Sequence, residues 1–353
     1  MVPPVRDAVV VITGASSGIG KATAAAFAKQ GARLVLCARR DAELQDTATE
    51  CREAGVQVET VIVDVAVADQ VQALAARAIE AFGRIDIWIN NAGMDAFGTF
   101  ADMPLEVIER CLQINLFGTI HGMKAVLPHF IAQGSGVIIN NASLVGIIPT
   151  PFHSAYVASK FAIRGLSHSV RQELIDHPNV HVCTVCPSSI DTPLWQRGAN
   201  YSGRKIKPLD PVHPVEQVAA VMLGLATSPR REVFAGATGW MLSEQHHADP
   251  ELTETMAAGV ARLSLFEDAP AEPTTGSLFE ANDHEGGATG GWMKPGTPSL
   301  PMGDLLAVAA TPALFALPAM FAMQVGRQFV AQWARQLPTM PMLPFGPTAR
   351  EEQ

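Results

Sequence analysis

Short apolar runs alternate with alanine-rich helical stretches through the first 250 residues, and this alternation constrains the fold more than any other feature. The runs have the length of β-strands and are Ala8–Thr13, Arg33–Cys37, Val56–Val63, Ile85–Asn90, Gly136–Asn140 and Val180–Val185. Stretches with helical periodicity lie between them, including Gly20–Gln30, Ala42–Ala54 and Val67–Phe82. Strands that are apolar on both faces are typical of a parallel sheet covered by helices on each side. The pattern therefore predicts an α/β fold with a doubly wound parallel sheet.

A glycine-rich turn, Thr13–Gly20, follows the first predicted strand and precedes the first predicted helix. Gly14 permits a tight turn, Gly18 allows the backbone to approach a pyrophosphate, and Gly20 allows close packing of helix on strand. The helix that begins here offers free N–H groups and the positive end of its dipole. At the start of a doubly wound sheet, this turn indicates a dinucleotide-binding site.

The end of the second predicted strand bears on the choice of dinucleotide. An NAD site usually has an Asp or Glu there to bond the ribose 2′-hydroxyl, whereas this chain has Ala38 followed by Arg39 and Arg40. A guanidinium suits a 2′-phosphate in charge and in geometry. We therefore expect NADP(H), bound by Arg39, while Arg40 also fits a solvated position at the start of a helix.

Tyr156 and Lys160 are four residues apart, which places them on one face of a helix. A tyrosine with its usual pKa of about 10 is a poor acid–base catalyst unless its phenolate is stabilised, and a neighbouring ammonium group stabilises it. Ser143 follows the fifth predicted strand, at the sheet edge where ligands bind in such folds. These three residues are candidates for a catalytic site.

With these elements in this order, the chain resembles the short-chain dehydrogenase/reductase family, whose fold is of the Rossmann type. The resemblance covers roughly residues 7–240. It rests on the glycine turn, Asp64, Asn90-Asn91-Ala92-Gly93, Asn115, Ser143, Tyr156, Lys160 and Thr192.

The resemblance implies a role for each of these residues. Tyr156 would exchange a proton with the substrate oxygen, Lys160 would hold the nicotinamide ribose, and Ser143 would bond the substrate oxygen. Asn115 would position a water in a proton relay. The other implied cofactor-binding residues are Thr13, Gly14, Ser16, Ser17, Gly18, Ile19, Gly20, Arg39, Asp64, Val65, Asn91, Ala92, Gly93, Pro187, Ile190 and Thr192.

The segment after the sixth predicted strand departs from the family in one place, because Ser188 follows Pro187 where the family usually has glycine. Ser188 adds a side chain where the backbone of family members passes close to the nicotinamide, but Asp191-Thr192-Pro193 still matches the family, so we expect cofactor binding to survive. Family members bind substrate with this segment, about Ser188–Pro214. The residues that could line a substrate site are Leu194, Trp195, Tyr201, Met94, Phe97, Leu144, Ile148, Phe152 and His153. These mostly apolar side chains favour a hydrophobic steroid, retinoid or lipid-like substrate, and packing of the flap alone is the alternative.

The predicted catalytic domain comprises residues 1–248, and the remaining chain divides by composition into further segments. Of the net charge of −9, residues 249–298 carry −7, together with five prolines and several glycines. This composition predicts a mobile acidic linker, with an ordered flap as the alternative. Residues 299–337 are apolar, and Leu305–Gly326 is uncharged over a length close to a membrane span. It could span a membrane, lie on one or pack against protein; residues 338–353 form a tail.

Other features exclude some functions. The acidic balance argues against a nucleic-acid binder, and the five cysteines are scattered as in a reduced cytoplasmic protein, with no metal site expected. No secretory signal is visible. We therefore predict an NADP(H)-dependent oxidoreductase of carbonyl and alcohol groups, possessing a C-terminal segment for membrane association and resembling family members that form homo-oligomers. The alternative is a cofactor-binding scaffold or redox-sensing protein with vestigial catalysis.

Overall fold

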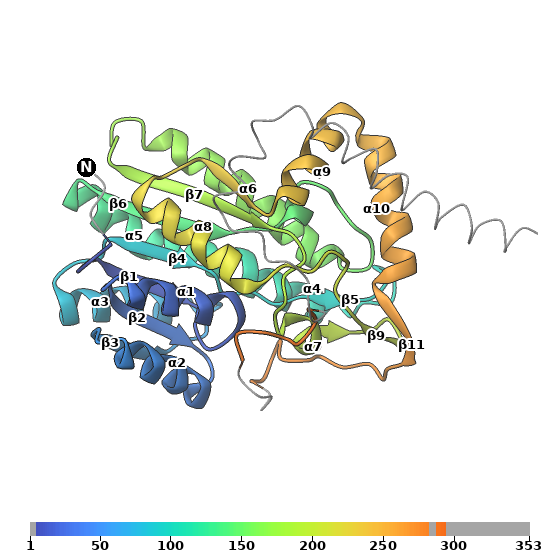
Figure 1. Ribbon diagram of the computed structural model, residues 1–353, viewed down its shortest axis with the longest axis horizontal. Coiled ribbons are helices and arrows are strands. Elements are labelled where there is room, and N and C mark those ends of the chain that lie inside the picture. Colours follow the sequence, from blue (N-terminus) through green and yellow to red (C-terminus); the bar gives the residue numbers. More distant parts are fainter. Residues whose placement is uncertain (1–4, 282–286, 294–353) are drawn as a thin grey trace, which may run out of the picture. The chain divides into compact units, whose positions relative to one another are not determined.

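The computed structural model describes residues 5–281 and 287–293 of the 353-residue chain. Seven parallel strands form the main sheet in the order β10-β7-β6-β4-β1-β2-β3 (Figure 1). These strands are β1 (Val9–Thr13), β2 (Arg33–Ala38), β3 (Val58–Ile62), β4 (Ile87–Asn90), β6 (Gly136–Asn141), β7 (Val180–Pro187) and β10 (Glu232–Ala235). The predicted doubly wound parallel sheet is confirmed. The seventh strand was missed because its short sequence carries a weak apolar signal.

Helices cover both faces of this sheet (Figure 1). The covering helices are α1 (Gly18–Lys29), α2 (Asp41–Glu53), α3 (Ala68–Phe82), α4 (Leu105–Leu112), α5 (Gly118–Gln133), α6 (Ser154–Glu173) and α8 (Val215–Thr227). The helices α7 (Leu194–Arg197), α9 (Ala237–Ala248) and α10 (Pro250–Ser264) lie beyond the sheet (Figure 1). A π-helical turn, Gln113–Phe117, joins α4 to α5. Two small sheets pair β5 (Ala96–Phe97) with β8 (Ala199–Asn200), and β9 (Arg204–Ile206) with β11 (Phe266–Pro270).

The core consists of two layers because successive side chains of a strand point to opposite faces. On one face, Ile12 of β1 belongs to the same buried cluster as Phe27 of α1 and Met222 of α8. On the other face, Val11 of β1 packs with Leu74 of α3 and Phe130 of α5. This double burial explains the uninterrupted apolar runs.

The predicted mobile linker is wrong for the described part of residues 249–298. Asp249 caps α10 by accepting a hydrogen bond from the Leu252 N–H at 3.0 Å, and Pro250 occupies the first turn. Antiparallel pairing joins β11 to β9, with Phe266 opposite Ile206. The acidic side chains that suggested disorder are spread along α10, β11 and the following loop. Charge content alone therefore gave the wrong prediction for a segment that contains an ordinary helix start.

The apolar segment Leu305–Gly326 and the tail 338–353 lie outside the described residues. The membrane association predicted for the segment therefore remains a prediction. Within residues 5–281 and 287–293, no helix combines the length and hydropathy needed to cross a membrane.

Candidate active site

The carboxyl ends of β1, β4, β6 and β7 meet at one edge of the sheet, and most predicted site residues lie there. The register places Asn90 opposite Asn140 and Asn141 opposite Val185. Asn91 follows β4, and its side-chain amide donates to the Thr13 carbonyl at 3.0 Å. The Thr13 hydroxyl oxygen accepts from the N–H groups of Asn91 (2.9 Å) and Ala92 (3.0 Å). These bonds fix the glycine turn against the end of β4.

The glycines of the turn are required by its geometry. Gly14 and Gly18 have φ values of +67° and +56°, which L side chains rarely adopt. A Cβ on Gly20 would lie 2.1 Å from the Gly14 carbonyl oxygen. The N-terminus of α1 therefore sits directly against the turn, as a pyrophosphate-binding site needs. Thr192, whose Cγ2 would lie 3.4 Å from a Cβ on Gly18, borders the same place.

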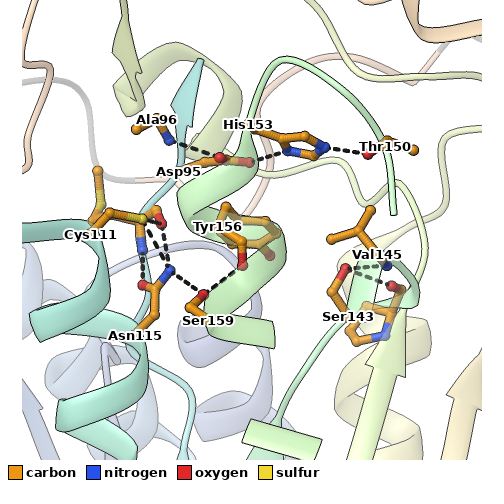
Figure 2. A network of polar contacts seen from close by, with 12 residues as sticks. Asp95, Ala96, Cys111, Asn115, Ser143, Val145, Thr150, His153, Tyr156 and Ser159 are labelled. Atoms are coloured by element: carbon orange, nitrogen blue, oxygen red, sulfur yellow. Dashed lines mark hydrogen bonds and ion pairs between the residues drawn. The ribbon is translucent and has the colours of Figure 1, made fainter. Parts of the chain in front are cut away.

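Tyr156 and Lys160 lie one turn apart on α6, as expected. The Lys160 Nζ donates to the Asn141 carbonyl at 2.7 Å and lies 5.2 Å from the centroid of the Tyr156 ring. Ser143 follows β6 and is buried; its hydroxyl donates to the Pro187 carbonyl at 3.4 Å and accepts from the Val145 N–H at 3.3 Å. Figure 2 shows Tyr156 between Ser143 on one side and Ser159 and Asn115 on the other.

Asn115 is held inside the π-helical turn, fully buried. Its side-chain oxygen accepts from the Met94 N–H at 2.8 Å, and its amide donates to the Met94 carbonyl at 2.9 Å and to the Ser159 hydroxyl at 3.1 Å (Figure 2). A Cβ on Gly93 would lie 3.3 Å from the Asn115 side-chain oxygen and 3.7 Å from the Lys160 Nζ. Asn115 therefore fixes the Gly93-Met94 segment that passes beside Lys160, and π-helical turns often occur at functional sites.

Burial dominates the electrostatics of this pair. It raises the pKa of Tyr156 well above its usual value, the charge of Asp95 raises it further, and a hydrogen bond with Ser143 opposes the shift. Burial also lowers the pKa of Lys160 to about 8. With the protein's own groups alone around it, Tyr156 is therefore a protonated phenol at neutral pH.

A buried Asp95–His153 pair beside Tyr156 was not recognised in the sequence beyond His153 itself. The His153 Nδ1 lies 3.1 Å from the Asp95 carboxylate, and its Nε2 contacts the Thr150 hydroxyl (Figure 2). Its ring stacks on Tyr156 with centroids 5.8 Å apart and on Phe97 at 5.7 Å. His153 therefore helps to hold the Tyr156 ring in place. Asp95 lies far from His153 in the sequence, and no local motif marks it.

The predicted 2′-phosphate and adenine residues already have protein partners. The Arg39 guanidinium donates to the carbonyl oxygens of Ser277, Leu278 (2.9 Å) and Phe279 (3.4 Å). Asp64 pairs with Arg110, which the sequence did not single out. Val65 accepts a hydrogen bond through its carbonyl from the ring of His121, at 2.9 Å, and so packs against α5.

The serines of the glycine turn also contact arginines. Arg40 lies 3.4 Å from the hydroxyls of both Ser16 and Ser17 and pairs with Glu43. Arg197 of α7 donates to the Ser17 hydroxyl at 3.0 Å. No sequence motif pointed to Arg197, because it reaches the turn only through the fold.

The loop that follows Pro187 keeps an ordinary backbone despite Ser188. Among the described residues, only Asp7 and Phe152 are non-glycine residues with positive φ, so position 188 does not need glycine. A bridge between Ile190 and His213 holds the loop, and the Asp191 N–H donates to the His213 carbonyl at 2.9 Å. The loop therefore adopts this backbone with a serine at position 188, and Thr192 lies beside Gly18 of the glycine turn.

Aromatic side chains of the expected substrate wall pack together. Phe97 is fully buried and stacks on Trp195 with centroids 5.9 Å apart, and Phe152 meets Phe266 edge-on. Ile148 is buried in a separate small cluster. Phe97 and Ile148 therefore serve packing, which was the alternative. The remaining predicted lining residues Met94, Leu144, Leu194 and Tyr201 are partly exposed.

Comparison with known proteins connects this geometry to a family. The model of the short chain dehydrogenase family matches residues 8–200. An uncharacterized oxidoreductase, YxnA of Bacillus subtilis, is 33% identical over 295 residues, which is 82% of this chain and 83% of YxnA.

Two solved structures are similar in fold. One is a short chain dehydrogenase/reductase from Burkholderia phymatum in complex with NAD (TM-score 0.65, 26% identity, 77% of this chain and 99% of that one). The other is a metagenomic short-chain oxidoreductase in complex with NADP (TM-score 0.57, 32% identity, 66% of this chain and 97% of that one). The chain belongs to the short-chain dehydrogenase/reductase family of oxidoreductases.

Proposed function

We propose that this protein is an NADP(H)-dependent oxidoreductase that interconverts a carbonyl group and an alcohol, with Tyr156 as the acid–base group. The observation that carries the proposal is the placement of Tyr156 and Lys160 on one face of α6, beside Ser143 at the end of β6. A scaffold without catalysis would not require a buried lysine 5.2 Å from a tyrosine ring.

The residues at the sheet edge fit a nicotinamide dinucleotide. The glycine turn at Gly14, Gly18 and Gly20 lets α1 begin directly against the end of β1, and the backbone N–H groups at this helix start would bind the pyrophosphate. Asn91 supports the end of β4, and Lys160 and Thr192 lie where the nicotinamide riboside would be held. The bound dinucleotide would supply or accept the hydride.

The proton steps follow from the protein's own groups. Because burial keeps the Tyr156 phenol protonated at neutral pH, it can donate a proton to a carbonyl oxygen that is hydrogen-bonded to Ser143. The Lys160 ammonium stabilises the phenolate that remains. Asn115 holds the Met94 backbone beside these groups and would order the water through which the proton is replaced.

The preference for NADP(H) rests on the end of β2. Ala38 leaves no carboxylate there to bond a 2′-hydroxyl, and Arg39 and Arg40 follow it. Similar proteins are described with either NAD or NADP, so the arginines carry this part of the proposal. The substrate is proposed to be hydrophobic, because partly exposed Met94, Leu144 and Leu194 accompany the aromatic cluster.

The catalytic role is tested by Tyr156→Phe in a panel of hydrophobic ketones and aldehydes with NADPH. Loss of the phenolic proton should lower kcat by about 100-fold or more, while the dissociation constant for NADPH stays unchanged and shows that the variant is folded. The other tyrosine of the chain supplies the comparison: Tyr201→Phe should lose far less. Undiminished turnover in Tyr156→Phe contradicts the mechanism, and tight NADPH binding without turnover of any panel member favours the scaffold alternative.

The cofactor preference is tested by Arg39→Ala, with Arg40→Ala as the matched neighbour. Removing a charge-assisted contact to the 2′-phosphate should weaken NADPH binding by about 10- to 100-fold relative to NADH binding. Titration of each dinucleotide by fluorescence measures both constants. If Arg40→Ala and not Arg39→Ala changes the ratio of the two constants, the 2′-phosphate role belongs to Arg40.

A further inference from the structure

Two described pieces of the chain after β11, residues 274–280 and 287–293, lie on the residues assigned above to the dinucleotide; we call them together the C-terminal strap. In Figure 1 the orange-to-red trace returns from β11 to the sheet. Thr274 pairs with Asn200 of β8 through two backbone hydrogen bonds of 2.8 and 3.0 Å. The Ser277 N–H then donates to the Arg197 carbonyl at 2.8 Å. These bonds seat the first piece beside Arg39.

Leu278 is the centre of this first piece. Its carbonyl accepts hydrogen bonds from Arg39 at 2.9 Å and from Arg110 at 3.1 Å, and the Ser277 and Phe279 carbonyls also face Arg39. Its side chain is fully buried, in the cluster to which Val65 belongs and against which Ala92 packs. Peptide carbonyls and a leucine therefore occupy the place proposed for the 2′-phosphate and the adenosine.

The second piece contacts the other end of the proposed cofactor site. The Gly287 carbonyl accepts from the Gly18 N–H at 3.0 Å, at the start of α1. The N–H groups of Gly290 and Trp292 both donate to the Asp191 carboxylate at 2.9 Å. A Cβ on Gly290 would lie 2.4 Å from the Thr192 carbonyl oxygen, so this piece lies directly on the loop that follows Pro187.

We propose that the C-terminal strap is an intramolecular competitor of the dinucleotide, and that cofactor binding displaces it. This inference rests on the proposed function of the site. The Arg39 guanidinium and the Gly18 N–H cannot serve the strap carbonyls and the phosphates of a dinucleotide at once. Phosphates form charge-assisted hydrogen bonds with these donors, which are stronger than bonds to neutral carbonyls, so the exchange favours the ligand.

The competition has a quantitative signature. If only the fraction of molecules with a displaced strap binds the dinucleotide, the apparent dissociation constant equals the intrinsic constant divided by that fraction. The same fraction applies to NADPH and to NADH. Weakening the strap must therefore tighten both by one factor and leave their ratio unchanged, whereas substitution of Arg39 changes the ratio.

The test compares dissociation constants for NADPH and NADH between the unaltered chain and two independent strap variants. Leu278→Ala empties the buried position, and Gly290→Ala places a methyl group against the Thr192 carbonyl oxygen. Each should tighten both dinucleotides by about tenfold, which corresponds to the loss of about 1.4 kcal/mol of strap binding. Phe279→Ala is the matched control, because that side chain is exposed and its truncation should change neither constant.

Hydrogen exchange of the Gly290 and Trp292 amides provides a second measurement that does not depend on affinity. Adding NADPH should speed their exchange if the strap is displaced. Slower exchange, together with weaker binding by Leu278→Ala, would show that the strap clamps the cofactor and overturn the competition. Unchanged constants in both variants also overturn it. If no variant binds either dinucleotide, the proposed function fails together with it; if all bind equally, only the competition fails.

Discussion

Lys160 shows how one buried charge connects the site to the stability of the fold. Its Nζ is enclosed between the Asn141 carbonyl and the Tyr156 ring, and burial lowers its pKa to about 8 from the 10.5 of a free lysine. Because the folded environment disfavours the charged form, the contribution of Lys160 to stability is least favourable at pH values where its amine is protonated. The residue is therefore expected to be a cost to folding near neutral pH that the site retains for its chemistry.

The sign of this effect gives a prediction. Between pH 8 and 10.5 the unfolded chain binds more protons at this position than the folded protein. The contribution of Lys160 to the free energy of unfolding therefore increases as the pH rises. Relative to Lys160→Met, the wild-type protein should gain about 1–2 kcal/mol between pH 8 and 9.5. Urea unfolding of both proteins at the two pH values measures this difference. Parallel pH dependence in the two would contradict the assigned environment.

Among the helices and loops, the junction of β1 and α1 is tightly packed. The Gly20 position has no room for a side chain, whereas a Cβ on Gly165 in α6 would meet nothing within 4 Å. Both glycines lie in helices. Replacing each with alanine therefore separates the effect of the space available for a side chain from the effect of helix propensity.

We expect opposite outcomes for these two glycines. Gly20→Ala should lower the free energy of unfolding by about 1–3 kcal/mol through overpacking against the Gly14 carbonyl. Gly165→Ala should raise it by about 0.5–1 kcal/mol, because alanine loses less backbone entropy in a helix. Thermal and urea unfolding of both variants provide the measurement. A destabilised Gly165→Ala would show that the space around α6 is not as open as the geometry indicates.

The elements also show what the sequence could and could not predict. Six strands, the glycine turn and the spacing of Tyr156 and Lys160 were readable because each depends on local periodicity or on spacing within one helix. The Asp95–His153 pair and the Arg110–Asp64 pair were not, because their members are joined only by the packing of distant elements. The residues 250–270 were misjudged because charge content outweighed the helix-start signal Asp249-Pro250.

At the scale of the whole molecule, the cysteines report on the integrity of the fold. All five, at Cys37, Cys51, Cys111, Cys183 and Cys186, are free and buried. Burial raises the pKa of Cys37 to about 12 and that of Cys183 to about 11, so neither thiol is reactive in the folded state.

The folded protein should therefore resist thiol reagents at pH 8, and unfolding in urea should expose all five thiols to reaction. Labelling followed by mass spectrometry counts the modified residues at each urea concentration. The midpoint of labelling should agree with that of the loss of helix signal, as expected for a single cooperative unit. Rapid modification of any of the five in the absence of urea would identify a locally opening part of the structure.

The strand order of the sheet has a consequence for how this chain is made. Strand β1 lies between β2 and β4, and a buried Asp86 carboxylate, just before β4, accepts the Val9 N–H of β1 at 2.9 Å. During synthesis β1, β2 and β3 leave the ribosome as a three-stranded piece whose inner edge stays open until β4 is made. Strand β1 thus waits for its partner β4, and until β4 is made its open edge can pair with a strand of another chain.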